Sequence, residues 1–234
     1  MKKLIQFSLP VFIICSQAFA IAGLGVSANQ SLFSVDANTV ALFPDTPGLG
    51  EFTHHGMNNG YGLGGYLYID AIPFVDIDIE GNFVASTYNF SFGNPLMEAS
   101  GTTIDNMQFA WISGSGYLTV KRKLLQFKIP ILAKAKLSAG AGMNSHSSIP
   151  MIDLKMLEAV VPEGDLNKEL DSDKLVDYLI ENKVSLTGFH IQTGLQFKVL
   201  MLDSFLYYRQ VFANNVIQDA KGFGSLNFRL GMGF

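Results

Sequence analysis

Apolar and polar residues alternate with a period of two over much of the chain. In residues 75–85 the odd positions are mainly apolar, whereas the even positions carry Asp76, Asp78, Glu80 and Asn82. Because successive side chains of a strand point to opposite faces, this pattern predicts a strand with one apolar and one polar face. The pattern recurs, so the predicted strands cover residues 22–32, 61–71, 75–85, 110–120, 131–143, 187–199, 205–213 and 224–234.

The lengths of these strands and of their connections indicate a membrane protein. A strand that crosses a bilayer needs about 9–11 residues, whereas strands of globular proteins centre near 5–6. Most of the predicted strands have 11 residues or more. The connections alternate between long and short: the long ones are 35–59, 93–107, 144–186 and 214–224, and the short ones are 72–74, 122–128 and 200–203.

An even number of strands, with all long connections at one end, is typical of transmembrane barrels. We therefore predict an all-β fold: a closed, up-and-down antiparallel transmembrane β-barrel of about eight strands. Its short turns would face the periplasm. A ten-stranded arrangement stays open if residues 39–43 pair within the first long connection.

The first twenty residues have the features of a cleaved secretory signal peptide. Lys2 and Lys3 precede a short apolar stretch, and residues 18–20 read Ala-Phe-Ala, which predicts cleavage after Ala20. The apolar stretch is shorter than the roughly 20 residues that a membrane-spanning helix needs. Residues 21–234 would then form one domain. Cys15 is the only cysteine, so the mature chain would have no disulfide and no thiolate metal site.

Composition supports a membrane barrel and argues against nucleic acid as a partner. Hydrophobic residues make up 48% of the chain, mean hydropathy is +0.26 and charged residues are 15%, against about 25% in soluble domains. Removal of Lys2 and Lys3 changes the formal net charge from −4 to −6. An acidic chain is poorly suited to neutralise phosphates.

The alternating strands resemble those of the eight-stranded bacterial outer-membrane β-barrel proteins, over the whole mature chain. The most specific part of the resemblance is the final segment, Gly-Ser-Leu-Asn-Phe-Arg-Leu-Gly-Met-Gly-Phe, in residues 224–234. The resemblance implies a location in the outer membrane, contact with its lipids, and recognition by the barrel-assembly machinery. The residues that would carry this assembly signal are Phe228, Leu230, Met232 and Phe234.

Residues 144–186 interrupt the alternation. Apolar residues at helical spacing occur in 152–161 and again in 175–180, where Asp171 and Ser172 are good N-cap types. We predict two short helices in the third external connection. Residues 144–184 hold nine Asp or Glu and four Lys. This loop would be a lid, a docking surface or a self-packed excursion.

The same alternation places many charged side chains inside the barrel. Isolated charges are costly to bury, and eight strands enclose little more than side chains. We therefore expect a network of ion pairs that fills the lumen, although a small polar pore stays an alternative. The residues of this predicted lumen network are Asp70, Asp76, Asp78, Glu80, Lys134, Lys136, His190, Lys198, Arg209 and Arg229.

Two further expectations concern His190 and the aromatic residues. His190 would face the lumen as a hydrogen-bonding group, or as a pH-sensitive gate. Eight aromatic residues suit the interfacial girdles of a membrane barrel: Tyr61, Phe83, Tyr88, Phe90, Phe92, Phe197, Phe205 and Phe234.

Histidines in the long connections allow an enzyme hypothesis. His54 and His55 lie near Glu51 in the first connection, and Ser145, His146, Ser147 and Ser148 lie in the third. A Ser/His pair could transfer or hydrolyse acyl groups of lipids. The sequence offers no acid partner at a fixed spacing, and no third ligand spaced for a zinc site beside His54 and His55.

The leading prediction is a non-enzymatic outer-membrane protein that acts through its external loops, with no cofactor and with an unidentified external ligand. The alternatives are a small channel for polar or hydrophobic solutes and a lipid-modifying enzyme.

Overall fold

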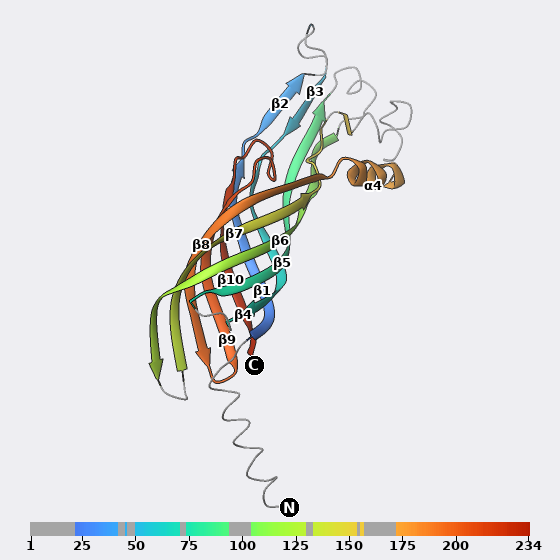
Figure 1. Ribbon diagram of the computed structural model, residues 1–234. Coiled ribbons are helices and arrows are strands. Elements are labelled where there is room, and N and C mark those ends of the chain that lie inside the picture. Colours follow the sequence, from blue (N-terminus) through green and yellow to red (C-terminus); the bar gives the residue numbers. More distant parts are fainter. Residues whose placement is uncertain are drawn as a thin grey trace, which may run out of the picture.

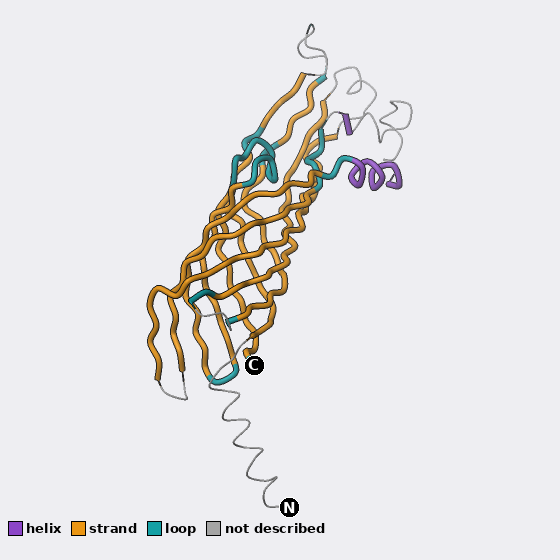
Figure 2. Tube along the Cα trace, in the orientation of Figure 1, coloured by secondary structure: helices purple, strands orange, loops and turns teal. Residues whose placement is uncertain are grey.

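The structure is a computed structural model that describes residues 22–41, 45, 50–70, 74–93, 104–129, 133–153, 155–156 and 172–234. The predicted signal peptide, residues 1–20, and the predicted cleavage site lie outside the described residues. Strands wind into a tilted tube, with a short helix beside one end (Figures 1 and 2).

Eight antiparallel strands close into a ring, which confirms the predicted fold class. Each pairs with its neighbours in the order β1-β4-β5-β6-β7-β8-β9-β10, and β10 pairs with β1. The ring strands are β1 (Ala22–Val35), β4 (Met57–Ile69), β5 (Asp76–Gly93), β6 (Ile104–Ile129), β7 (Ala133–Ser148), β8 (Val184–Val199), β9 (Leu202–Phe212) and β10 (Phe223–Gly233).

Two short strands extend the sheet without entering the ring. β2 (Asn38–Ala41) pairs with β3 (Glu51–His54), and β3 pairs with the end of β5 from Phe90 to Gly93. Among the described residues the sheet therefore has ten strands, of which eight form the barrel. The question of eight or ten strands is resolved in this way.

The register of the ring fixes its width. A path along the paired residues leaves β1 at Ala22 and returns to β1 at Leu32, ten residues further along. This displacement round the ring is the shear of the barrel, and it makes the strands tilt relative to the barrel axis. The interior of an eight-stranded barrel is just wide enough to be filled by side chains.

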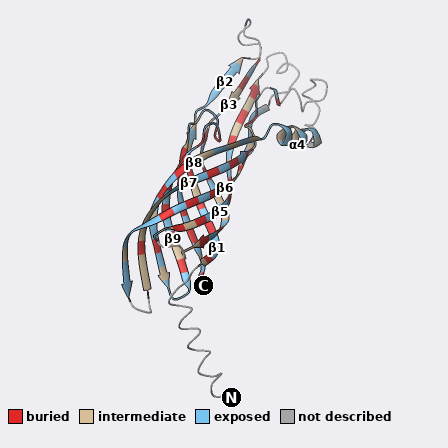
Figure 3. Ribbon diagram, viewed as in Figure 1, coloured by how far each residue is buried: buried red, intermediate tan, exposed pale blue. Residues whose placement is uncertain are grey.

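Burial alternates along the ring strands in the sense that the sequence predicts. In β5 the even positions from Asp76 to Val84 are buried, whereas Ile79 and Phe83 are exposed. Figure 3 shows the alternation as bands of buried and exposed residues along the tube. The exposed face is apolar and the buried face is largely polar, which is the reverse of a soluble protein.

Several predicted boundaries were wrong. Residues 122–128 are strand and not a turn, because β6 runs on to Ile129 and pairs with β7 down to Ala133. This hairpin projects beyond the other strands at the end where β1 begins and β10 ends (Figure 1). At the opposite end β7 continues through Ser148, so residues 144–148 do not belong to the loop.

The predicted aromatic girdle was wrong in four positions. Tyr88, Phe90 and Phe92 are buried because β5 keeps its alternation beyond the predicted strand end, and Phe205 is buried because it shares the inner face of β9 with Arg209. By contrast, four of the predicted aromatics are exposed on the outer face: Tyr61, Phe83, Phe197 and Phe234.

One of the two predicted helices is described in full. α4 (Ser172–Glu181) begins where the N-cap residues predicted it, and Leu175, Tyr178 and Leu179 pack on a buried apolar cluster. In the first predicted helix, residues 152–161, only positions 155 and 156 are described as helical, and 157–161 lie outside the described residues. No helix in the described part of the chain is both long and apolar enough to span a membrane.

We predict that a cation on the apolar outer wall will be costly only at mid-height. Ile79→Arg should lower the free energy of folding into lipid vesicles by about 2–4 kcal/mol, because the charge would lie in hydrocarbon. Ser147→Arg is the matched control: Ser147 is exposed near the external rim, where the cost falls to about 0–1 kcal/mol. Urea titration of folding measures both, and equal losses would contradict a membrane-embedded wall.

Candidate functional site

Glu80 lies at the centre of the lumen, surrounded by donors from the opposite wall. Arg209 Nη2 of β9 donates to Glu80 Oε2 at 2.7 Å, and Tyr207 Oη donates to the same oxygen at 2.7 Å. Arg229 Nη2 of β10 also pairs with it. Both arginines and Glu80 are almost completely buried. Such charge-assisted bonds are strong when every partner is present.

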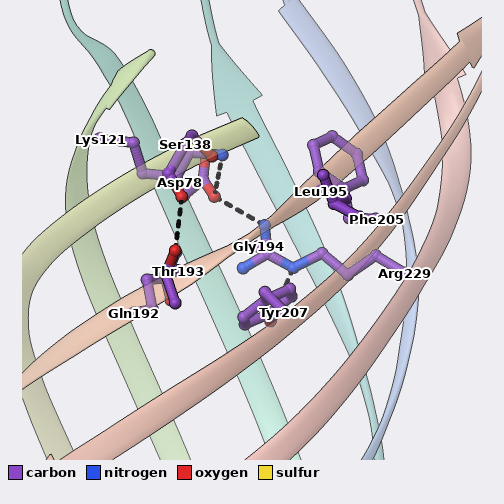
Figure 4. A pocket seen from close by; sticks show the side chains of 10 residues that line it. All are labelled: Asp78, Lys121, Ser138, Gln192, Thr193, Gly194, Leu195, Phe205, Tyr207 and Arg229. Atoms are coloured by element: carbon purple, nitrogen blue, oxygen red, sulfur yellow. Dashed lines mark hydrogen bonds and ion pairs between the residues drawn. The ribbon is translucent and has the colours of Figure 1, made fainter. Parts of the chain in front are cut away.

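Asp78 extends this cluster along the lumen. Its Oδ2 accepts from Arg229 Nη1 at 2.7 Å and from Lys121 Nζ at 2.7 Å. Figure 4 shows Arg229 directed toward Asp78 and Tyr207 between the surrounding strands. Arg229 therefore joins both carboxylates, while its Nε donates to Tyr207 Oη at 2.9 Å.

Aromatic rings hold the two arginines from the sides. The Arg209 guanidinium lies 3.7 Å from the ring centre of Tyr117. That of Arg229 lies 4.7 Å from the ring centre of Tyr207 and 4.8 Å from that of Tyr66. Cations over aromatic faces gain further attraction when they are removed from water. We call Asp78, Glu80, Lys121, Tyr207, Arg209 and Arg229 the central network.

Two smaller groups of ion pairs lie toward the end near the termini. Lys136 pairs with Asp76 and lies 3.6 Å from Asp70, which also lies 3.8 Å from Lys134. In the second group, Lys198 lies 3.5 Å from Asp203. Tyr68 and Gln196 also hydrogen-bond Asp203.

His190 is fully buried above the central network and is not ion-paired to a described residue. Its Nε2 lies 2.8 Å from Thr119 Oγ1, and its ring packs edge-on against Tyr117. His146 packs edge-on against Tyr117 and Phe223.

The ten residues of the predicted lumen network thus all lie on the inner side of the sheet, although they divide among separate groups. Lys121, Asp203 and Tyr207 belong to these groups but were missed from the sequence. Lys121 directly follows the predicted strand 110–120. Asp203 and Tyr207 are an even number of residues away from Arg209, so they lie on the same face of the strand. Extending the alternation by one or two residues would have found Lys121 and Asp203, whereas Tyr207 already lies within the predicted strand 205–213.

Small cavities lie inside the barrel at two levels. Beside the central network lies a cavity of about 10 Å³, and a second of about 10 Å³ lies next to Asn29, Asn82 and Ser113; each has room for about one water molecule. Toward the long connections the interior becomes apolar. Members of this mouth cluster include Met57, Phe90, Trp111, Met156, Val211 and Ile217.

The residues of the enzyme hypothesis lie apart. His54 is buried in β3 with its Nε2 3.3 Å from Met151 Sδ, and burial lowers the pKa of His54. His55 Nε2 lies 2.7 Å from Ser91 Oγ. In β7, His146 faces inward, whereas Ser145 and Ser147 face outward. No group of three or more His, Cys, Asp or Glu side chains among the described residues could hold a metal ion.

The predicted assembly residues form one row on β10. Phe228, Leu230, Met232 and Phe234 are all exposed on the outer face, while Asn227 and Arg229 between them point inward. Their recognition by the assembly machinery stays a prediction.

Comparisons with solved structures return small membrane barrels. They include the outer membrane protein OprG from Pseudomonas aeruginosa, with 8% identity over 91% of this chain and 94% of that chain, and a TM-score of 0.49. The N-terminal β-barrel domain of OprF from the same species has 9% identity over 91% and 99%, with a TM-score of 0.41. Ail, the attachment invasion locus protein of Yersinia pestis, has 11% identity over 91% and 95%, with a TM-score of 0.34 in one structure.

No protein-family model and no curated protein sequence matches the chain. At these identities and TM-scores, the likeness to the solved barrels says nothing about activity. The closed barrel follows from the chain's own strand pairing.

We predict that removal of one cation from the central network is strongly destabilising. Arg229→Met leaves Asp78 and Glu80 without a shared partner, so the free energy of unfolding should fall by about 3–5 kcal/mol. The matched control Lys198→Met should cost less, because Asp203 keeps its bonds from Tyr68 and Gln196. Urea unfolding in micelles measures both.

A second substitution tests the cause. Arg229→Lys keeps a positive charge beside Asp78 and Glu80, and it should lose less stability than Arg229→Met. An equal loss in the two variants would show that side-chain shape and packing, rather than charge pairing, dominate at Arg229.

Proposed function

We propose that this protein is a bacterial outer-membrane β-barrel with a permanently closed lumen, which acts as a structural or binding protein through its external part. The central network would hold the barrel in one shape and would not conduct solutes. The external part consists of the β2–β3 hairpin, the projecting ends of β5 and β6, and α4.

The outer wall supports the membrane location. Apolar side chains cover it on every ring strand, for example Val26 on β1, Leu63 on β4, Leu118 on β6 and Leu230 on β10. A wall of this kind is stable in hydrocarbon and would aggregate in water. The signal peptide predicted for residues 1–20 supplies the route of export.

The single observation that carries the proposal is the small size of two cavities inside the barrel, one beside the central network and one beside Asn82. The two cavities within the barrel each have a volume of about 10 Å³, far below the several hundred Å³ of sites for small molecules. Five carboxylates and six cations pair across the interior: Asp70, Asp76, Asp78, Glu80 and Asp203 with Lys121, Lys134, Lys136, Lys198, Arg209 and Arg229. Positive and negative charges in the lumen are therefore nearly balanced. This balance favours a packed interior over a pore that selects for cations or for anions.

The external part offers the surface that would bind a partner. β5 and β6 remain paired as far as Phe92 and Ile104, well beyond the end of β9 at Phe212. On this projection α4 exposes Val176 and Ile180, at 53% and 60% of their full areas, and β2 exposes Val40 at 45%. Exposed apolar side chains on a folded projection are typical of interaction sites.

Planar-bilayer conductance tests the closed lumen. The wild-type protein should show no steady single-channel steps, whereas its heat-modifiable migration on gels should show a folded barrel. A second protein, with residues 36–56 replaced by Asn-Gly, tests whether the hairpin acts as a lid. Val35 pairs directly with Met57, so this turn keeps the β1–β4 register.

The shortened protein should also insert and stay silent, because the network below the mouth closes the lumen. Steady steps from the wild type would refute the closed barrel. Steps from the shortened protein alone would make the hairpin a lid, and the channel would then be the better function.

A further inference from the structure

A groove crosses the outer wall of the barrel beside the start of β5, toward the end that holds the short turns. It spans two rows of paired residues on β6 to β9, of which one runs Val120, Ala141, Ile191, Gln210 and the next runs Arg122, Ala139, Thr193, Tyr208. Its volume is about 570 Å³ and its lining is almost entirely apolar. This volume lies within the range of about 300–1,000 Å³ that is usual for small-molecule sites.

Small residues form the floor of this outer-wall groove. Ala139, Gly140 and Ala141 follow one another on β7, whereas Val120, Ile191 and Tyr208 on the flanking strands form its sides. A Cβ atom at Gly140 would lie 2.6 Å from the carbonyl oxygen of Val120, so glycine lets β6 and β7 approach here. The ladder between β7 and β8 is continuous from Ala133 to Ser148, so the groove opens to the outside only.

Two polar side chains in the groove have a hydrogen-bond partner within the chain, whereas Arg122 has none in its described part. Tyr208 Oη donates to Gln210 Oε1 at 2.6 Å, and Thr193 Oγ1 donates to the carbonyl of Ser138 at 3.2 Å. Arg122 is exposed and has no ion pair or hydrogen bond with any residue in the described part of the chain. A cation on a lipid-facing wall needs an anionic group or a path to the interface.

The position of Arg122 identifies which anion it can meet. Val75, which also lines the groove, directly precedes β5, and Lys121 pairs with the first residue of that strand. Arg122 therefore lies near the end of the barrel that holds the short turns, at the level of the inner leaflet. There the available anions are phospholipid phosphates, to which arginine is well suited.

We propose that the outer-wall groove binds one anionic phospholipid of the inner leaflet, with an acyl chain over Ala139 and Ala141 and its phosphate against Arg122. The proposal rests on the outer-membrane location proposed above, because lipid is then the only solvent that reaches the groove. The apolar floor favours binding of an acyl chain, and the single cation, Arg122, favours a lipid that carries negative charge.

Native mass spectrometry of the full-length mature protein in mild detergent, with added phosphatidylglycerol or phosphatidylcholine, tests this assignment. The wild type should retain phosphatidylglycerol about tenfold better than phosphatidylcholine, as expected for one charge-assisted contact. Arg122→Gln should abolish the preference, and Ala141→Phe, which fills the floor from an exposed position, should reduce retention of both lipids.

Two matched controls isolate the groove. Lys123→Gln removes the neighbouring cation, which pairs with the inward-facing row of β7, and Ala28→Phe adds the same ring to an exposed site on β1. Both should behave as the wild type. A retained preference in Arg122→Gln, or unchanged retention in Ala141→Phe, would overturn the lipid site.

Insertion into lipid vesicles, followed by heat-modifiable migration, separates the two proposals. A wild type that inserts but shows no preference between the lipids overturns the lipid site alone. A wild type that fails to insert overturns the membrane location and the lipid site together.

Discussion

Glu80 is buried inside a ring of strands, and its charge can be accommodated only when cations from the far wall reach it. β9 is four strands from β5 in either direction round the ring, so the bond from Arg209 to Glu80 spans the barrel. Arg229 reaches the same carboxylate from β10. A carboxylate left unpaired in this interior would cost several kcal/mol. Closure of the ring and completion of the central network are therefore one event.

The remaining interior is arranged around these long side chains. β1 and β4 supply small inward residues, such as Ser27 and Gly62, beside the charged residues of β5. A Cβ atom at Gly62 would lie 2.6 Å from the carbonyl oxygen of Phe83 and 2.8 Å from Asn29 Oδ1. Glycine on the inner face of β4 thus leaves room for the amides that surround Glu80, among them Asn82, which donates to it at 2.5 Å. Alternation of small and long side chains lets a narrow barrel fill without strain.

The sequence predicts the ring well because one physical rule governs every strand. A lipid-facing wall must be apolar at each second residue, so Ile77 to Phe83 and Leu226 to Phe234 can be assigned without knowledge of their neighbours. The strand ends follow no such rule once the chain leaves the bilayer. Tyr88, Phe90 and Phe92 lie on the inner side of a projecting hairpin. Both faces of this hairpin can be apolar, so only the alternation of positions along β5 shows which face these residues occupy.

Pairing across the lumen is equally hard to predict, for a geometric reason. Alternation shows that Asp76, Asp78 and Glu80 point inward, but their partners depend on the shear of the ring. With a shift of ten residues, Asp76 meets Lys136 whereas Asp78 and Glu80 meet Arg229 and Arg209. A different register would exchange these partners without changing the residues that face the lumen. The sequence therefore predicts the composition of the lumen network but not its connections.

The closed lumen that we propose would move any function to the surfaces of the barrel. The interior uses its cations on internal carboxylates, so few are left for a solute, and the mouth cluster shields them from the outside. The outer wall has the opposite property, because Arg122 is a cation for which the described chain provides no anion. Among the described residues the charges of the lumen are paired, whereas Arg122 lies unpaired beside an apolar groove. In a membrane, an anion of the surrounding lipid would have to pair with Arg122.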